Sequence, residues 1–195
     1  KPEKEGEYII LTTHNNKADI INRDKLAKLT GTVHAFKATV TGDFNENNVT
    51  AETELKLKEG AQVMFIRNDK GEKPRYYNGK IGVVKSIKGE TITVTFQDNS
   101  YDVVVEKETW ENKRYKLNKE TDILEEDVKG TFTQFPIRLA WAITIHKSQG
   151  LTFDKAIIDA GDSFAAGQVY VALSRLTSLD GLVLHSKISG DSISS

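Results

Sequence analysis

Two short apolar runs, separated by a segment of helical length, constrain the fold most tightly. Residues 155–159 (KAIID) and 182–184 (LVL) have the length and composition of buried strands. Between them, residues 164–176 follow an Asp-Ser pair suited to a helix N-cap and carry apolar side chains at helical spacing, and Gly181 then interrupts the chain. A strand, a helix and a strand within about thirty residues predict a βαβ unit, and hence a parallel sheet covered by helices.

The N-terminal part predicts a second strand and helix of the same α/β domain. Residues 8–13 (YIILTT) read as a buried strand, and residues 14–16 form a turn with capping side chains. Residues 17–29 are expected to form an amphipathic helix. We expect four apolar residues on or near its buried face: Ile20, Ile21, Leu26 and Leu29.

The middle of the chain changes to the period of two that is typical of strands. Further strands are expected at 32–40 and 62–67, with an exposed loop at 41–51. From residue 80 onward the pattern predicts a meander of three short strands with tight turns, which favours a small antiparallel barrel. These three strands are expected at 81–87, 91–96 and 101–105. The charged segment 106–129 fits no element clearly.

Composition excludes several classes of site. The 195 residues carry 27 basic and 28 acidic side chains, a net charge of −1, so any nucleic-acid surface must be local. The chain has no cysteine, which excludes disulfides and thiolate metal sites and leads us to expect a cytoplasmic protein. No apolar run reaches transmembrane length, so no membrane partner is expected. The start at Lys1 suggests a piece of a longer protein.

The sequence lacks the parts that a nucleoside triphosphatase needs to work alone. No G-x-x-x-x-G-K-[ST] phosphate loop occurs, and no acidic pair follows an apolar strand in a way that would hold Mg²⁺. The chain alone is therefore expected not to hydrolyse ATP, and it could supply only the other half of a composite site.

Two polar signatures in the last third point to a family. Residues 144–152 read TIHKSQGLT, and residues 169–175 read VYVALSR. In order, spacing and nearly every residue, they resemble the fifth and sixth motifs of superfamily-one helicases of the Pif/RecD-like group. Residues 9–22 (IILTTHNNKADIIN) are similar to the fourth motif of that group.

The resemblance implies a RecA-like parallel-sheet domain of the P-loop NTPase type, without its own phosphate loop and with an inserted Src-homology-3-like β-barrel. The motor domain would be discontinuous, at 1–79 and 130–195, the barrel would occupy 80–129, and 189–195 would be a frayed tail. The family's members are DNA helicases that use ATP and Mg²⁺ and move 5′ to 3′ on single-stranded DNA. The expected partners are therefore single-stranded DNA and the missing N-terminal RecA-like domain of the same chain.

The resemblance assigns Arg175 as the arginine finger, and Gln149 and Gly150 as further ATP contacts. An arginine delivered from a second domain can stabilise the charge on a departing phosphoryl group. Arg175 could instead only neutralise a helix C-terminus, and Gly150 could be a plain turn glycine. Hydroxyl, imidazole and ammonium groups close together suit the phosphates of a single strand. The candidate DNA contacts are Thr144, His146, Lys147 and Ser148.

A second basic stretch leaves another function open. Residues 110–119 interleave aromatic with basic side chains, so Lys113, Arg114 and Lys116 are weaker DNA candidates, or else a solvated surface. The alternative to a motor domain is a non-catalytic module that binds nucleic acid or protein on an α/β platform. Residues 139–146 fit either a strand or a helix.

Overall fold

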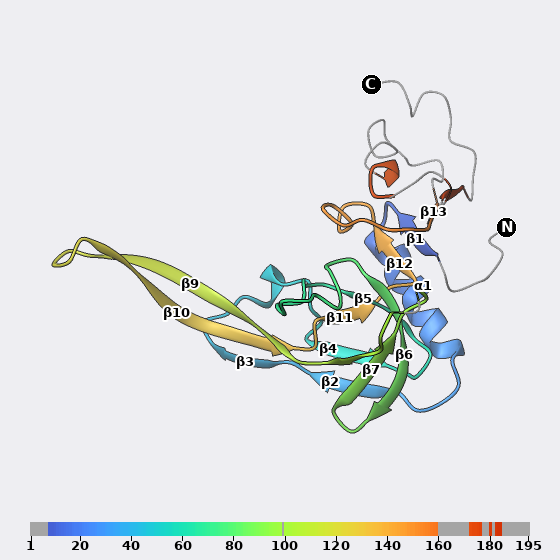
Figure 1. The fold of residues 1–195 in the computed structure, drawn as a ribbon, viewed down its shortest axis with the longest axis horizontal. Helices are drawn as coiled ribbons and strands as arrows, with labels where there is room; N and C mark the ends of the chain where they lie inside the picture. Colours follow the sequence, from blue (N-terminus) through green and yellow to red (C-terminus); the bar gives the residue numbers. More distant parts are fainter. Residues whose placement is uncertain (1–7, 99, 160–171, 177–179, 181, 185–195) are drawn as a thin grey trace, which may run out of the picture.

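The computed structural model describes residues 8–98, 100–159, 172–176, 180 and 182–184, and shows an α/β arrangement of one parallel and several antiparallel sheets (Figure 1). The parallel sheet has the strand order β12-β1-β13-β14. Its strands are β1 (Ile9–Thr12), β12 (Ala142–Thr144), β13 (Ala156–Ile158) and β14 (Leu182–Leu184). The predicted strands of the βαβ unit are confirmed. The helix expected between them falls mostly on residues 160–171, outside the described part.

Helix α1 (Asn15–Lys28) follows β1 and packs against the parallel sheet, as predicted. The predicted apolar face is confirmed at Leu26, which is buried, but not at Ile20, which is 46% exposed. The buried side chains follow a spacing of four residues, and they are Ala18, Asn22 and Leu26. A polar residue therefore replaces an apolar one at the centre of the face, where it meets the edge strand β12.

The predicted meander is confirmed as part of a larger sheet. Strands β6 (Ile81–Lys88), β7 (Thr91–Thr95) and β8 (Val103–Val105) are antiparallel. Strands β5 (Gln62–Phe65) and β11 (Ile137–Leu139) extend them into a five-stranded sheet of order β11-β5-β6-β7-β8. Strands β5 and β11 belong to the same sheet but lie outside the expected insertion in sequence. The insertion limits 80–129 therefore stay a prediction.

The single strand expected at 32–40 is two strands in different sheets. Strand β2 (His34–Lys37) pairs with β4 (Glu54–Leu57), whereas β3 (Thr39–Gly42) pairs with β10. The change occurs at Ala38, whose N–H donates to the carbonyl of Thr53 across 2.8 Å instead of to a ladder partner. The expected loop 41–51 contains the end of β3 and a short 3₁₀ helix, η1 (Glu46–Asn48), and is otherwise irregular.

The unassigned segment 106–129 is the most extended part of the structure. It forms most of a hairpin of β9 (Glu108–Asn118) and β10 (Ile123–Gln134), which projects far from the rest of the chain (Figure 1). We call residues 108–134 the arm. Strand β3 supports only its base, in the order β3-β10-β9.

Two apolar clusters hold these elements together. The first joins the parallel sheet, through Leu11 and Ile143, to Met64 of β5 and Phe132 of β10. The second consists mainly of side chains from the five-stranded sheet and also contains Leu26 of α1 and Phe36 of β2. The first cluster is therefore continuous from the parallel sheet to the base of the arm.

Candidate functional site

The candidate site lies at the edge where the parallel strands end. Thr12, Thr144 and Ile158 end adjacent strands, so the segments that follow them meet at one edge of the sheet. In open α/β sheets this carboxyl edge is where ligands bind. The first signature, residues 144–152, begins at this edge. The strand β12 also settles residues 142–144 as a strand and not a helix.

Buried hydroxyls hold the first signature in a tight turn. The Ser148 hydroxyl donates to the carbonyl of Ile145 across 2.7 Å, and the Thr144 hydroxyl accepts from the N–H of Lys147 at 3.2 Å. Thr144 is 3% exposed and Ser148 is fully buried. In this arrangement both hydroxyls bond within the turn and do not face solvent. Their predicted DNA contacts stay predictions.

The other polar side chains at the tip of the turn face outward. His146, Lys147, Gln149 and Gly150 are all exposed. Gly150 has a φ of +79°, in the left-handed region that glycine adopts at little cost, and a Cβ there would meet no atom within 4 Å. The turn therefore presents an imidazole, an ammonium, an amide and an uncovered stretch of backbone at the carboxyl edge.

The second signature is held directly against the first. The N–H of Phe153 donates to the carbonyl of Arg175 across 2.6 Å, and Phe153 forms a parallel bridge with Leu176. The Nε of Arg175 is buried and has no hydrogen-bond partner among the described residues. The fold thus joins two residues that are 22 positions apart in sequence, and it leaves one donor of the arginine unused by the described chain.

An ion pair at the same edge has no sequence signal. Lys17, in the first turn of α1, pairs with Asp159, which directly follows β13. The two residues are 142 positions apart, so only the strand order brings them together. The β1–β13 pairing, with Leu11 beside Ile158, is the link that sequence reasoning lacked.

The weaker DNA candidates lie on the arm, away from the turn, and their charges are matched. Lys113 pairs with Glu126 at 2.9 Å and Glu111 at 3.4 Å. Arg114 lies 3.7 Å from Asp43, and Lys116 stands opposite Glu125 in the β9–β10 register. Their role in DNA binding stays a prediction.

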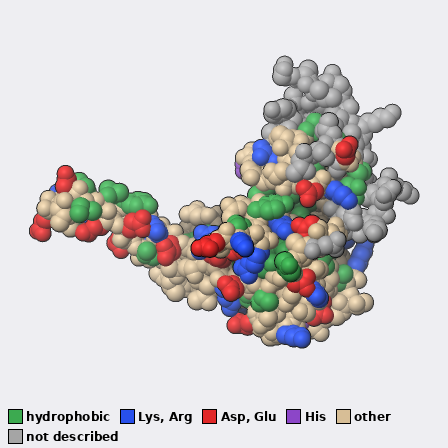
Figure 2. Space-filling model, in the orientation of Figure 1, with side chains coloured by type: hydrophobic (Ala, Val, Ile, Leu, Met, Phe, Trp, Pro, Cys, Tyr) green, Lys and Arg blue, Asp and Glu red, His purple; other side chains and the backbone are tan. Residues whose placement is uncertain are grey.

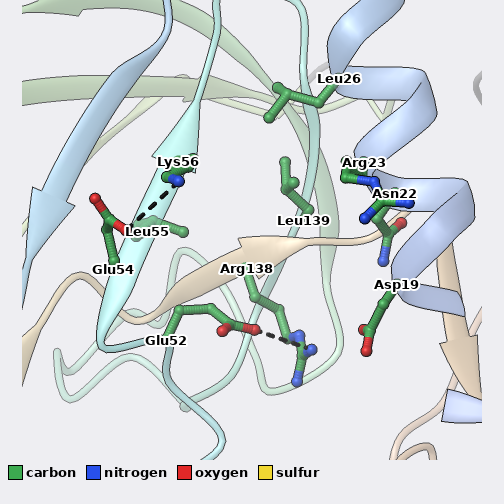
Figure 3. A pocket seen from close by; sticks show the side chains of 10 residues that line it. All are labelled: Asp19, Asn22, Arg23, Leu26, Glu52, Glu54, Leu55, Lys56, Arg138 and Leu139. Carbon is green, nitrogen blue, oxygen red and sulfur yellow. Dashed lines mark ion pairs between the residues drawn. The ribbon is translucent and has the colours of Figure 1, made fainter. Parts of the chain in front are cut away.

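A separate pocket lies between α1 and strands β4 and β11 (Figure 3). It has a volume of about 250 Å³, and the Arg138 guanidinium, paired with Glu52 at 3.2 Å, reaches into it. Its charged lining balances three acids against three bases: Asp19, Glu52, Glu54, Arg23, Lys56 and Arg138. This balance does not favour a phosphate-rich ligand.

The described residues contain neither a metal-binding cluster nor a membrane-spanning helix. No group of three His, Cys, Asp or Glu side chains in the described ranges could hold a metal ion. None of the helices described is long and apolar enough to cross a bilayer.

Comparison with known proteins connects this geometry to a family. No family model matches the sequence. The chain is 32% identical to the ATP-dependent DNA helicase Pif1 of Campylobacter jejuni over 93% of its own length and 43% of that protein. It is similar to Bacteroides Pif1 in complex with ADP-AlF4, at 41% identity and a TM-score of 0.87 over 97% of this chain and 42% of that one.

The relatives of this chain are Pif1 helicases, and it matches one part of them. Bacteroides Pif1 bound to single-stranded DNA is also similar, at 40% identity and a TM-score of 0.73, with all of this chain and 44% of that one covered. The Pif/RecD-like resemblance of the two signatures is thereby confirmed. The chain spans less than half the length of these Pif1 relatives.

Proposed function

We propose that this chain is the second RecA-like part of an ATP-dependent DNA helicase of the Pif1 type. One observation carries the proposal: the Phe153–Arg175 hydrogen bond joins the residue that follows the first signature to the last residue of the second. In such a helicase Lys147 of the first segment would contact DNA, and Arg175 of the second would reach ATP. The direct connection between the segments would couple movement along the DNA strand to the state of the nucleotide. In this proposal strands β6, β7 and β8 belong to the family's Src-homology-3-like insertion.

Arg175 is the proposed arginine finger. ATP would lie between this chain and the N-terminal RecA-like domain, which supplies the phosphate loop and the Mg²⁺ ligands that the described residues lack. The guanidinium would stabilise charge on the γ-phosphoryl group as it leaves. The Arg175 Nε is buried and has no hydrogen-bond partner among the described residues, which supports this role, because a buried donor is costly unless it has a partner in another state of the protein.

The exposed face of the turn is the proposed nucleic-acid contact. Lys147 and His146 can donate to phosphate oxygens of a single strand, as Thr144 and Ser148 could if the turn opened. Gln149 and Gly150 would face the nucleotide, where the backbone of Gly150 can approach a phosphate closely. ATP-driven closure of the two domains would then shift the turn along the strand.

DNA-stimulated ATP hydrolysis by the full-length protein tests the proposal. Lys147→Glu should weaken binding to labelled oligo-dT and reduce the dependence of log affinity on log salt by about one unit. Reversal of the arm charges at Lys113, Arg114 and Lys116 should weaken binding less, because acidic neighbours already match these charges. Loss of binding only in the arm variant, with no ATP hydrolysis in the parent protein, would support the non-catalytic binding module instead.

A further inference from the structure

The outer half of the arm is a two-stranded ribbon with no supporting layer. Strand β3 pairs with β10 only from Gly130 to Thr133, and the β9–β10 register shifts between Val128 and Gly130. Beyond that point the ribbon runs out from the body of the structure (Figure 1). An isolated two-stranded hairpin is at best marginally stable in water, so a further layer would stabilise this one.

The strand register sorts the arm side chains onto two different faces. Residues directly opposite each other in an antiparallel pair lie on the same face. One face combines the pairs Leu117–Leu124, Tyr115–Glu126 and Lys113–Val128. The opposite face combines Arg114–Asp127, Lys116–Glu125 and Asn118–Ile123. The first face, which we call the apolar arm face, therefore presents Tyr115, Leu117, Leu124 and Val128.

The apolar arm face is open to solvent. Tyr115 and Leu117 are 59% and 54% exposed, and Leu124 and Val128 are 60% and 46% exposed. Hydrophobic side chains line one edge of the arm and acidic ones surround its tip (Figure 2). Apolar groups that lie together on a projecting element mark a surface for another macromolecule, whereas single exposed apolar residues are ordinary.

We propose that the apolar arm face docks on the part of the same Pif1-like polypeptide that lies outside these 195 residues. This inference rests on the proposed function, in which a larger part of the protein surrounds the chain. Pif1 relatives have more than half of their length outside the matched region, so such a part has ample surface. Docking would fix the arm, and through Phe132 at its base the first apolar cluster, relative to the other motor domain.

The charges of the arm argue against nucleic acid as the occupant. Residues 108–134 carry seven acidic and five basic side chains. Lys113 is the only cation on the apolar arm face, and its charge is balanced by Glu126, with which it is paired. On the other face Asn118 donates to Glu125 across 2.7 Å. Phosphate binding requires local excess positive charge, which this arm does not provide.

The size of the apolar arm face argues for a tethered partner over a second copy. Four side chains can cover only a few hundred Å², below the roughly 800 Å² per partner that a stable complex of separate chains buries. A partner in the same polypeptide needs less area, because its effective concentration is already in the millimolar range. The observations therefore favour docking within one protein.

Neighbouring residues of equal exposure provide a matched test. Leu124 is on the apolar arm face, and Ile123, which is 61% exposed, is on the opposite face. We would introduce Leu124→Cys and Ile123→Cys separately into the full-length protein and measure maleimide labelling of the arm peptide by mass spectrometry. The native chain contributes no cysteine of its own. Docking predicts labelling about tenfold slower at 124 than at 123, and equal rates for the two variants in the 195-residue chain.

Other outcomes overturn the proposal in distinguishable ways. Equal rates in a full-length protein with DNA-stimulated ATPase activity would reject docking while leaving the proposed function intact. Protection at 124 that appears only with oligo-dT would assign the face to DNA. Protection that increases with protein concentration would assign it to a second copy. Absence of DNA-stimulated ATPase activity from the unmodified full-length parent would instead count against the proposed function.

Discussion

The side chain of Asn22 pairs with both backbone polar groups of Ala142. Its Nδ2 donates to the Ala142 carbonyl across 2.9 Å, and its Oδ1 accepts from the Ala142 N–H at 2.8 Å. Asn22 is 7% exposed and β12 is an edge of the parallel sheet, so this amide substitutes for a neighbouring strand. It thereby fixes the strand from which the signature turn starts.

Replacing Asn22 by leucine should cost about 2–4 kcal/mol of unfolding free energy, because it leaves two buried backbone groups without partners. Urea denaturation of the two proteins measures the difference. Asn16→Leu is the matched control, since Asn16 is exposed in the first turn of α1 and should change stability little. Equal stability of the Asn22 variant and the parent would show that the pairing is not needed.

The Asn78-Gly79 turn supports the signature turn from the five-stranded sheet. Gly79 has a φ of +104°, and a Cβ there would lie 3.4 Å from the Cβ of Leu151. A Cβ alone would be in ordinary contact, but the γ-methyl groups of Gly79→Val reach further, so this change should displace Leu151 and weaken single-strand binding by about 0.5–2 kcal/mol. Gly31→Val controls for strain, because Gly31 has a φ of +98° and open space around it. Fluorescence anisotropy with labelled oligo-dT should separate the variants, and an equal loss in both would remove the coupling.

The base of the arm depends on a glycine that approaches a neighbouring strand. A Cβ at Gly130 would lie 2.4 Å from the carbonyl oxygen of Asp43, a backbone atom that cannot move away alone. Gly130→Ala should destabilise the protein by about 1–3 kcal/mol. At Gly71 the nearest atom would be 3.8 Å away, so Gly71→Ala should stay within about 0.5 kcal/mol of the parent. Thermal unfolding of both variants checks this difference.

Stability should fall in acid through Asp69. The Arg75 side chain donates to its carboxylate at 2.8 and 3.3 Å, and this hydrogen bonding lowers the pKa of Asp69 to about 2. A lowered pKa stabilises the folded state above the ordinary pKa of 3.8, and that contribution disappears as the pH falls from about 4 to 2. Arg75 is half exposed, so solvent screening reduces the contribution to about 1 kcal/mol.

Asp69→Asn should therefore be less stable than the parent at pH 7 and equal to it near pH 2. Chemical denaturation across this pH range measures the difference. A constant difference between the Asp69 variant and the parent at all pH values would contradict the assigned cause.

Local patterns predicted the meander and three strands of the parallel sheet, β1, β13 and β14, because each buries an apolar run or alternates along its length, whereas the region of β12 fitted either a strand or a helix. Asn22 escaped prediction because an amide can fill a helix's core position only when a strand edge needs its two hydrogen bonds, and that edge is a tertiary feature. The arm escaped because both of its faces meet solvent. Its alternation therefore mixes charged and apolar residues and resembles a solvated loop.

The site shows a similar division. The exposed Lys147 and the Gly150 backbone could be anticipated from residue type and family resemblance. The inward bonding of Ser148 and the Lys17–Asp159 pair depend on how the turn closes and on strand order, which no local pattern encodes.

Arg175 is proposed to act on ATP held by another domain. Steady-state ATP hydrolysis by the full-length protein with saturating oligo-dT tests this role, comparing Arg175→Ala with Arg23→Ala, whose arginine is exposed on α1. We predict that Arg175→Ala lowers kcat by about 10³–10⁵, with nucleotide affinity and melting temperature preserved, and that Arg23→Ala matches the parent. Undiminished turnover in a folded, nucleotide-binding Arg175→Ala protein would contradict the account.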